Sequence, residues 1–354
     1  MEYDLKGYKF SREEFFPKKL FDLIAEVRVE RPQEVKDYAL RRKRREKLTD
    51  DGKLLILAAD HPARMVTSAP GDPLGMGNRV DYLGRILRVA ATIGLDGVMS
   101  TPDILEDLLI VDLLNVEAGG ESFLDGQLLV GCLNRGGLIG ASFEMDDRMT
   151  AYTPQGLVKM GMDGAKLMFR IDLAEDGSGR TLEYCAKAID ECCDLGLPLF
   201  LEPLPTEKVD GAYRVKKTAE ANIKLMGVAS ALGYSSLNTW LKITYSPDFD
   251  RVVQAASLPL MMLGGESTGN PLGVLSQFQQ GMVLGGNVRG AMVGRNILFP
   301  GQDDPRAVAA GVDAIIHGGA TVDGAIEIMA IHRGRDMDRL TRLLMGPIRA
   351  RALP

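Results

Sequence analysis

The sequence predicts one (β/α)8 TIM barrel with a helical extension at each end. The length of 354 residues suits a barrel of about 250 residues plus such extensions. From about residue 53 onward, short apolar segments alternate eight times with amphipathic segments, and eight parallel strands joined by helical crossovers close into a barrel. The first strand is followed by AADHPAR rather than by a GxGxxG turn, which disfavours an open, doubly wound sheet.

The expected strands are short apolar runs that begin with KLLILAAD and end with VRGAMVGRN. Runs of this length and composition are typical of strands buried inside an α/β fold. The eight strands are expected at residues 53–60, 95–101, 127–134, 163–172, 197–203, 238–244, 258–266 and 288–296.

The expected helices carry apolar residues at helical spacing. The segment 79–94 stops at a glycine, 103–118 has an acidic first turn, and Thr153 and Pro154 supply an N-cap and a first-turn proline. The eight helices are expected at 79–94, 103–118, 153–161, 181–196, about 217–232, 248–257, 271–282 and 303–319. Residues 1–50 are expected to form an N-terminal helical extension, 51–319 the barrel, and 320–354 a C-terminal helical extension.

Composition disfavours several classes of function. Forty-two Lys and Arg against 48 Asp and Glu give a net charge of −6, which offers no general attraction to nucleic acid or to an anionic membrane. No stretch reaches the roughly 18 uninterrupted apolar residues of a membrane span, and the N-terminus lacks an apolar signal core. We therefore expect a cytoplasmic protein with four reduced cysteines.

Histidines are scarce, which bears on metal chemistry. Of His61, His317 and His332, only His61 falls near the expected catalytic face. A zinc-dependent enzyme commonly needs two or three converging imidazoles. We therefore expect no metal and no cofactor, although carboxylates alone could hold magnesium.

Polar residues at the carboxyl ends of the strands are the candidates for function, because this is where such barrels carry their active sites. Side chains two apart share a face of a strand, and the outer face packs under helices, so charged side chains should point into the lumen. This places Asp60, Lys166, Glu202 and Lys242 in or near one interior layer. Further candidate substrate contacts are Ser100, Asn134 and Arg170.

Two lysines and two carboxylates in a dry barrel mouth favour Schiff-base chemistry. Such charges are costly to bury unless they are paired. Burial and a second nearby cation both lower the pKa of an amine, and a neutral amine can attack a ketone. A carboxylate can then move the protons that carbon–carbon cleavage requires. Ion-paired barrel residues without chemistry are the alternative.

The last two strands predict an anion site. They end in LGGES and VGRN, and backbone N–H groups after these strands often hold a phosphate in this fold. Ser267 and Arg295 could add a hydroxyl and a guanidinium group. Ordinary tight turns are the alternative. The candidate residues are Gly264, Gly265, Glu266, Ser267, Gly294 and Arg295.

The segments LLILAADHPAR, DGAKLMFRID, LFLEPL, NTWLKITY, LMMLGGE and RGAMVGRNILFP carry a family resemblance over residues 53–316. The chain resembles class I aldolases of the branch that contains deoxyribose-phosphate, tagatose-bisphosphate and archaeal-type fructose-bisphosphate aldolases. It looks closest to a little-studied deoxyribose-phosphate-aldolase-like subgroup. The resemblance implies that Lys242 forms the Schiff base and matches Lys166, Glu202 and Asp60 to other active-site positions. Deoxyribose-phosphate aldolase usually has a further lysine after strand seven, which is absent here.

These residues lead to the hypothesis of a metal-independent class I aldolase. It would cleave a phosphorylated ketose or keto-sugar acid, such as 6-phospho-5-dehydro-2-deoxygluconate or a hexose bisphosphate, to dihydroxyacetone phosphate and an aldehyde. A sulfo-sugar aldolase, a non-catalytic sugar-phosphate sensor, and an isomerase or epimerase remain alternatives. We expect a homo-oligomer. The loop 141–152 is expected to shape substrate choice, to bridge subunits, or to form a surface cluster of ion pairs.

Overall fold

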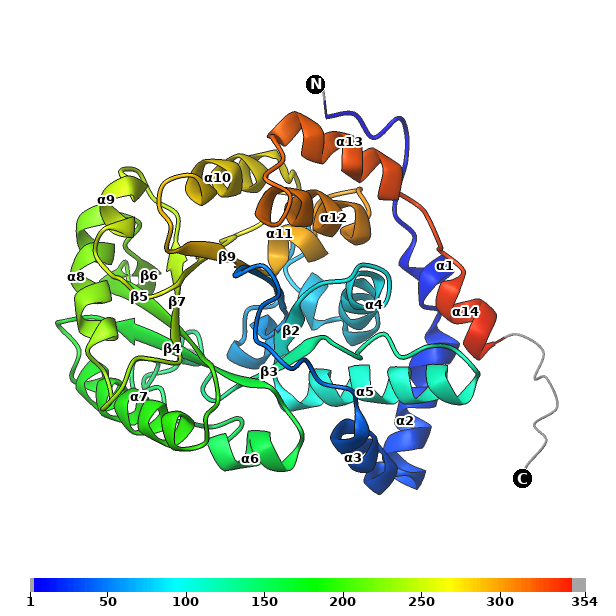
Figure 1. Ribbon diagram of the computed structural model, residues 1–354, viewed down its shortest axis with the longest axis horizontal. Coiled ribbons are helices and arrows are strands. Elements are labelled where there is room, and N and C mark those ends of the chain that lie inside the picture. The colour runs from blue at the N-terminus through cyan, green and yellow to red at the C-terminus, as the bar shows by residue number, and fades with distance from the viewer. Residues whose placement is uncertain (1–2, 136, 346–354) are drawn as a thin grey trace.

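The computed structural model describes residues 3–135 and 137–345, and it confirms the (β/α)8 barrel. Eight parallel strands form a closed ring with helices around it (Figure 1). The ring closes where Leu54 of the first strand pairs with Gly290 of the last. In ring order the strands are β1 (Leu54–Ala58), β2 (Gly97–Ser100), β3 (Leu128–Cys132), β4 (Gly164–Ile171), β5 (Leu199–Val209), β7 (Thr239–Thr244), β8 (Leu260–Leu263) and β9 (Val288–Val293).

A β-hairpin extends the barrel beyond the sequence expectation. The fifth strand was expected to end at residue 203, but β5 continues to Val209 and pairs antiparallel with β6 (Ala212–Val215). Asp210 and Gly211 connect the two strands with φ angles of 50° and 79°. An Asp-Gly pair in this left-handed conformation is a strong hairpin signal. The Asp-Gly hairpin signal was therefore present in the sequence. It lies in the segment that was expected to connect the fifth strand, ending at residue 203, to the helix beginning at about residue 217.

Helices at all eight expected places follow the strands, with differences at their ends. The longest, α7, begins at Asp176, five residues before the expected start, because residues 176–180 continue the helical turn. A short helix, α11 (Arg295–Leu298), lies at the end of the last expected strand. The others are α4 (Arg79–Ala90), α5 (Pro102–Glu117), α6 (Pro154–Lys159), α8 (Ala219–Ser230), α9 (Phe249–Val253), α10 (Leu272–Met282) and α12 (Pro305–Ile316).

The segments that flank the barrel are helical and lie on the same side of it (Figure 1). The N-terminal segment contains α1 (Arg12–Phe15), α2 (Lys18–Glu30) and α3 (Pro32–Arg41). The C-terminal segment contains α13 (Val322–His332), which packs on α12, and α14 (Arg339–Leu344). The helix expected to run to about residue 350 is thus two helices, and its last residues, 346–350, lie outside the described part of the chain.

The apolar core has two layers, and the inner one supports the site. Side chains of β1 alternate: Leu55 and Leu57 pack under the helices, whereas Leu54, Ile56 and Ala58 face the lumen. Lumen residues from the other strands, including Phe200 and Met292, fill the barrel below its carboxyl-terminal mouth. The same alternation, continued from Ala58 by two residues, places Asp60 directly above this inner apolar layer.

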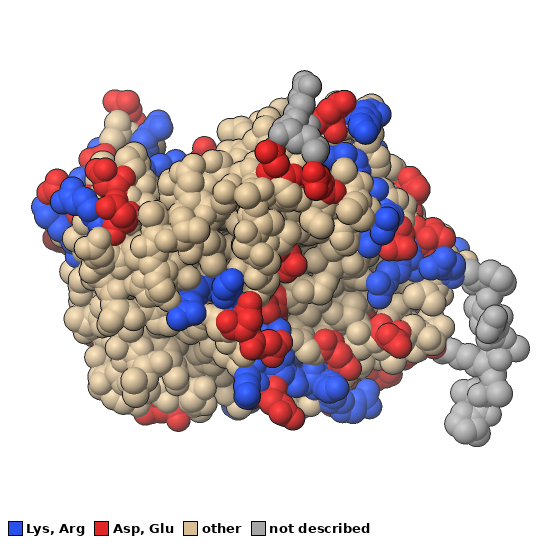
Figure 2. Space-filling view, turned by 45° about the horizontal axis from the view of Figure 1, so that its top comes forward, with Lys and Arg blue, Asp and Glu red and all other residues tan. Residues whose placement is uncertain are grey.

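The surface carries charges of both signs. On the face shown in Figure 2, lysines and arginines lie among aspartates and glutamates in mixed groups. Within residues 3–135 and 137–345, no helix is both long enough and apolar enough to span a bilayer.

Candidate active site

Four charged side chains meet at the mouth of the barrel, as strand alternation predicts. Lys166 on β4 donates to Asp60, with Nζ 3.2 Å from Oδ2, and lies 2.9 Å from Oε2 of Glu202. Lys242 on β7 donates to the same Glu202 oxygen over 3.0 Å. Glu202 on β5 therefore bridges the two lysines, and all four residues are buried.

The strands hold these four residues through their pleat. Trp240 and Lys242 share the lumen face of β7, and Phe200 and Glu202 share that of β5. Phe200 packs against Trp240 at a ring distance of 6.1 Å, one layer below the charges. Because the apolar layer is dry and close-packed, the charged layer above it is fixed in position and poorly solvated.

The two lysines have opposite electrostatic environments. Burial lowers the pKa of Lys242, and the charge of Lys166 lowers it further, against the opposing effect of Glu202. Burial also acts to lower the pKa of Lys166, but the pair of carboxylates, Asp60 and Glu202, outweighs it and raises that pKa. Lys166 is therefore held as a cation, whereas Lys242 loses its proton more easily than an ordinary lysine.

Both carboxylates stay ionised. Burial would raise the pKa of Glu202, but Lys166 and Lys242 together lower it to about 2. The pKa of Asp60 is also lowered, because the attraction of Lys166 and other cations exceeds the opposing effect of burial. Each carboxylate can thus accept a proton when one of its cations becomes neutral.

A narrow cleft opens above the cluster. Lys242, Glu202 and Asp60 line it, together with backbone at the ends of β8 and β9, whereas the fully buried Lys166 does not. The cleft has a volume of about 50 Å³.

Two residues outside the list of candidate site residues also line the cleft: His61, which was expected near the catalytic face without a role, and Arg64, which was not considered. They lie on a 3₁₀ turn, η1 (His61–Arg64), directly after Asp60. His61 Nδ1 is buried without a hydrogen-bond partner among the described residues, and burial lowers the pKa of this histidine to about 3. Arg64 donates to Met168 Sδ over 3.0 Å, and its Nε is buried without a partner in the described chain. A polar turn after a strand gives no sequence signal that its side chains fold back over the lumen.

Arginines give the cleft an excess of positive charge. Arg295 lines the same cleft, with its Nε also unpartnered among the described residues, and its contact with the exposed Glu266 is a loose 3.8 Å. The cluster and cleft thus hold four cationic side chains, Lys166, Lys242, Arg64 and Arg295, but only two buried carboxylates. An anionic ligand would balance this charge.

The glycines expected to bind the anion do line the cleft, but packing also requires them. A Cβ on Gly264 would lie 2.6 Å from Val293 Cγ2, and one on Gly294 would lie 2.2 Å from the Ala58 carbonyl oxygen. Gly265 has a φ of 69°, which favours glycine. Their presence in the sequence is therefore explained by close strand packing before any ligand is considered.

The other predicted contacts have protein partners and lie outside the cleft lining. Ser100 donates to the Ala59 carbonyl oxygen, and Ser267 donates to that of Phe299, each over 2.7 Å. Asn134 donates to Asp147 and to the Met168 carbonyl oxygen. Arg170 donates to Glu144 over 2.7 Å. Glu144 and Asp147 thus tie the loop 141–152 to β4 and to the end of β3.

We expect Arg64→Gln to weaken anion binding in the cleft. A hydrogen bond to a charged group contributes about 1.5–3 kcal/mol, which corresponds to roughly a 10- to 100-fold rise in the Kd for inorganic phosphate. Calorimetric titration of the whole protein measures this change, with Arg148→Gln as the control, because Arg148 is exposed and pairs with Asp146 away from the cleft. Unchanged phosphate affinity in Arg64→Gln would contradict the assignment of Arg64 to the anion.

Within the described residues, no group of three or more His, Cys, Asp and Glu side chains is arranged to hold a metal ion. The fold and the site together define a (β/α)8 barrel with a buried two-lysine cluster at its mouth. The family model named Cgl0159-like matches residues 52–316, and the chain belongs to this family.

One solved structure supports the family assignment, and two others share the fold. The crystal structure of Cgl0159 from Corynebacterium glutamicum is 35% identical and superimposes with a TM-score of 0.78, over 88% of this chain and all of that one. An archaeal fructose 1,6-bisphosphate aldolase is 21% identical with a TM-score of 0.55, over 80% of this chain and all of that one. A fructose-bisphosphate aldolase from Slackia heliotrinireducens is 14% identical with a TM-score of 0.60, over 91% and 96% of the two chains. The last two likenesses show a shared fold. The comparisons show the Cgl0159-like family and do not confirm the expected deoxyribose-phosphate-aldolase-like subgroup.

Proposed function

We propose that the protein is a class I aldolase in which Lys242 forms a Schiff base with a phosphorylated ketose. The observation that carries the proposal is the difference between the two lysines. Lys242 lines the cleft and its pKa is lowered, whereas Lys166 lies beneath it, paired with two carboxylates, and its pKa is raised. One amine is thus available as a nucleophile, and the other is a fixed cation that disfavours a charge on the first.

The reaction begins at the ketone carbon. The neutral Lys242 amine adds to the carbonyl, and a proton moves from the nitrogen to the oxygen to give a neutral carbinolamine. One further proton, taken up from solvent, lets the hydroxyl group leave as water and gives an iminium ion. While the nitrogen is a neutral carbinolamine, Glu202 loses one of the two cations that lower its pKa and becomes a better base. Glu202 is therefore our candidate for the group that exchanges protons with the leaving water and the substrate.

Cleavage uses the iminium ion as an electron sink. A carboxylate removes the proton of the hydroxyl group on the β carbon, which is two bonds from the iminium carbon. The bond between the α and β carbons then breaks, the β carbon becomes the aldehyde, and the electron pair of the broken bond forms an enamine. An aldehyde leaves, the enamine carbon takes back a proton, and water releases the ketone product from Lys242. Asp60 sits beside the same cluster and is placed to hold a substrate hydroxyl or to share the proton transfer.

The charge of the cleft favours a phosphate on the substrate. With Lys242 charged, as in the iminium ion, cations exceed buried carboxylates by two, which matches a phosphate dianion better than a singly charged sulfonate. Arg64 and Arg295 supply guanidinium groups for it. The substrate class is therefore a ketose phosphate or a phosphorylated keto-sugar acid, with dihydroxyacetone phosphate as the product released last.

Borohydride trapping tests this proposal directly. The protein is incubated with a hexose bisphosphate, with 6-phospho-5-dehydro-2-deoxygluconate and with dihydroxyacetone phosphate, each is reduced with borohydride, and peptides are analysed by mass spectrometry. We expect the adduct on the peptide that carries Lys242 and none on the peptide that carries Lys166. Cleavage without any trapped adduct, or cleavage abolished by EDTA, would contradict the Schiff-base route. Solvent deuterium uptake without carbon–carbon cleavage would indicate an isomerase.

A further inference from the structure

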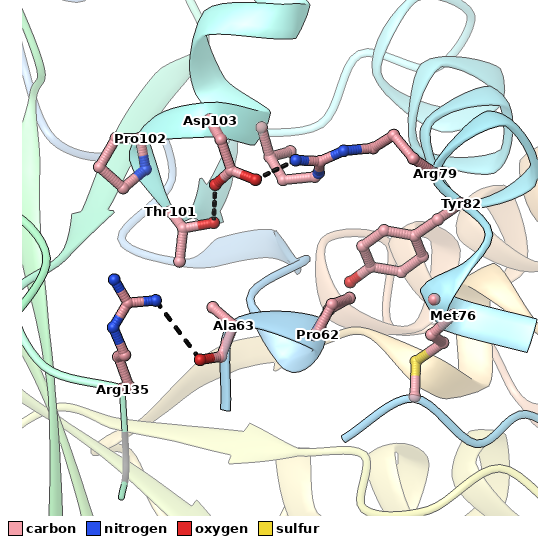
Figure 3. Close-up of a pocket in the computed structure, with 11 residues that line it drawn as sticks. Pro62, Ala63, Met76, Arg79, Tyr82, Thr101, Pro102, Asp103 and Arg135 are labelled. Atoms are coloured by element: carbon pink, nitrogen blue, oxygen red, sulfur yellow. Dashed lines mark hydrogen bonds and ion pairs between the residues drawn. The ribbon is translucent and has the colours of Figure 1, made fainter. Parts of the chain in front are cut away.

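A second and larger cavity lies on the other side of η1 from the cleft. It has a volume of about 470 Å³, within the usual range of roughly 300–1,000 Å³ for ligand pockets. Its walls are η1, a second 3₁₀ turn η2 (Gly75–Gly77), the first turns of α4 and α5, and Arg135 after β3 (Figure 3). The two spaces share no lining residue: Pro62 and Ala63 face this cavity, whereas His61 and Arg64 face the cleft.

Arg135 brings an unbalanced positive charge to the cavity. Its guanidinium group donates to the carbonyl oxygens of Ala63 over 3.4 Å and of Thr150 over 3.1 Å, and it has no carboxylate partner among the described residues. The other charged lining residues, Arg79 and Asp103, form an ion pair with each other. The lining therefore has a net charge of one positive unit, which a single negative charge would balance.

Tyr82 contributes a buried hydroxyl group that lacks an acceptor. The residue is fully buried, and its ring stacks on Phe299 at 6.2 Å. The backbone N–H of His61 faces the hydroxyl oxygen, but among the described residues the hydroxyl group itself donates to no acceptor. Figure 3 shows the ring across the cavity from Thr101 and Arg135, with the hydroxyl group pointing toward their side. A buried hydroxyl whose proton has no acceptor costs about 1–3 kcal/mol, so a ligand oxygen that accepts this proton would be favoured.

The remaining walls suit a short carbon skeleton. Pro62, Met76 and Ile104 offer apolar surface between the polar groups. Asp103 accepts from Thr101 and Arg79 and, as a carboxylate with about four acceptor sites, can also accept from a ligand hydroxyl.

We propose that this cavity binds a small hydroxycarboxylate. The planar guanidinium of Arg135 matches a carboxylate, the Tyr82 hydroxyl donates to a ligand oxygen, and Asp103 accepts from the ligand hydroxyl. A single carboxylate fits the net charge of the lining better than a phosphate dianion. The proposal does not depend on Schiff-base chemistry, because none of these residues belongs to the lysine cluster.

Binding of D-glycerate and lactate to the whole protein tests the proposal. Titrations are made in the Arg64→Gln/Arg295→Gln background, so that the cleft no longer offers its own guanidinium groups. We expect saturable binding of both acids, at least 10-fold tighter than binding of neutral glycerol. Arg135→Gln is expected to raise the Kd about 10-fold or more, and Tyr82→Phe, which keeps the stacked ring, about 3- to 10-fold. Arg148→Gln is the matched arginine control and should leave the Kd unchanged.

Several outcomes would overturn the proposal. Arg135 also holds loop backbone, so Arg135→Gln could lower affinity through a shifted loop; Tyr82→Phe tests the cavity without that change, and unaltered binding in Tyr82→Phe would count against the proposal. Glycerol binding as tightly as glycerate, or inorganic phosphate binding more tightly than both acids in the same background, would refute the ligand class. The acids should still bind to Lys242→Met, which separates failure of this inference from failure of the aldolase proposal.

Discussion

Replacing Lys242 by methionine is expected to lower kcat by on the order of 10^4-fold or more and to abolish the borohydride adduct, because no other cleft-lining amine is available in the described structure to form the imine. Methionine nearly conserves the side-chain volume, so packing above Trp240 should survive. Glu202 keeps its contact with Lys166 at 2.9 Å in this variant. The change thus removes the nucleophile while leaving each buried carboxylate with a cationic partner.

Lys166→Met is the matched control. It deletes an equally buried amine but leaves Asp60 without its lysine and Glu202 with Lys242 alone. Lys242 then becomes the only lysine beside two buried carboxylates, so its pKa should rise and trapping should slow at neutral pH. The adduct should nevertheless still form on Lys242. If an adduct instead appears on Lys166 in Lys242→Met, or if Lys242→Met still cleaves substrate at a substantial rate, the assignment of the nucleophile is wrong.

The alternation of side chains along each strand was sufficient to predict that the two lysines and two carboxylates lie together, because this alternation can be inferred from each strand separately. Once an apolar segment is recognised as a barrel strand, its pleat places Glu202 on the same face as Phe200, and Lys242 on the same face as Trp240. The same reasoning predicted the contacts of side chains at the strand ends less well. Ser100 is the last residue of β2, and because Met99 faces the lumen, the pleat turns Ser100 away from it, toward the Ala59 carbonyl oxygen. Asn134 follows β3 and binds the Met168 carbonyl oxygen instead of facing the cleft.

Residues on turns account for what the sequence did not reveal. Arg64 reaches the cleft because η1 folds over the first strand, and HPAR carries no signal for that path. The second cavity, for which we propose a hydroxycarboxylate ligand, is lined by four separate segments that meet only in the folded chain. Long-range ion pairs are equally invisible: Arg88 and Asp304 are 216 residues apart and yet bind each other in the protein interior.

The ion pair between Arg88 and Asp304 gives the largest expected effect on the free energy of unfolding. Arg88 of α4 donates to both carboxylate oxygens of Asp304, over 2.9 Å and 2.7 Å, and both side chains are fully buried. Arg88 also donates to the Arg335 carbonyl oxygen, and Asp304 accepts from Gly334 N–H. The pair therefore joins the first barrel helix, α4, to α12 and to the C-terminal segment.

Asp304→Asn is expected to lower the free energy of unfolding by about 3–5 kcal/mol, because it leaves the Arg88 charge buried without a counterion. Asparagine can still cap α12 as Asp304 does, through the Arg306 N–H, so loss of the cap contributes little. Urea unfolding followed by circular dichroism measures the change as a lower midpoint at unchanged slope. Asp338→Asn serves as the control, because Asp338 pairs with Arg342 on the exposed surface, where such a pair contributes about 0–1 kcal/mol.

A double variant separates the unpaired charge from other effects of the substitution. Arg88→Met in the Asp304→Asn background removes the uncompensated guanidinium and should restore part of the lost stability, since neutral replacement of both partners avoids burying a lone charge. If Asp304→Asn is no more destabilising than Asp338→Asn, the pair does not hold the C-terminal segment to the barrel. If the double variant is less stable than Asp304→Asn, the contact between the Arg88 guanidinium group and the Phe15 ring outweighs the cost of the unpaired charge at this position.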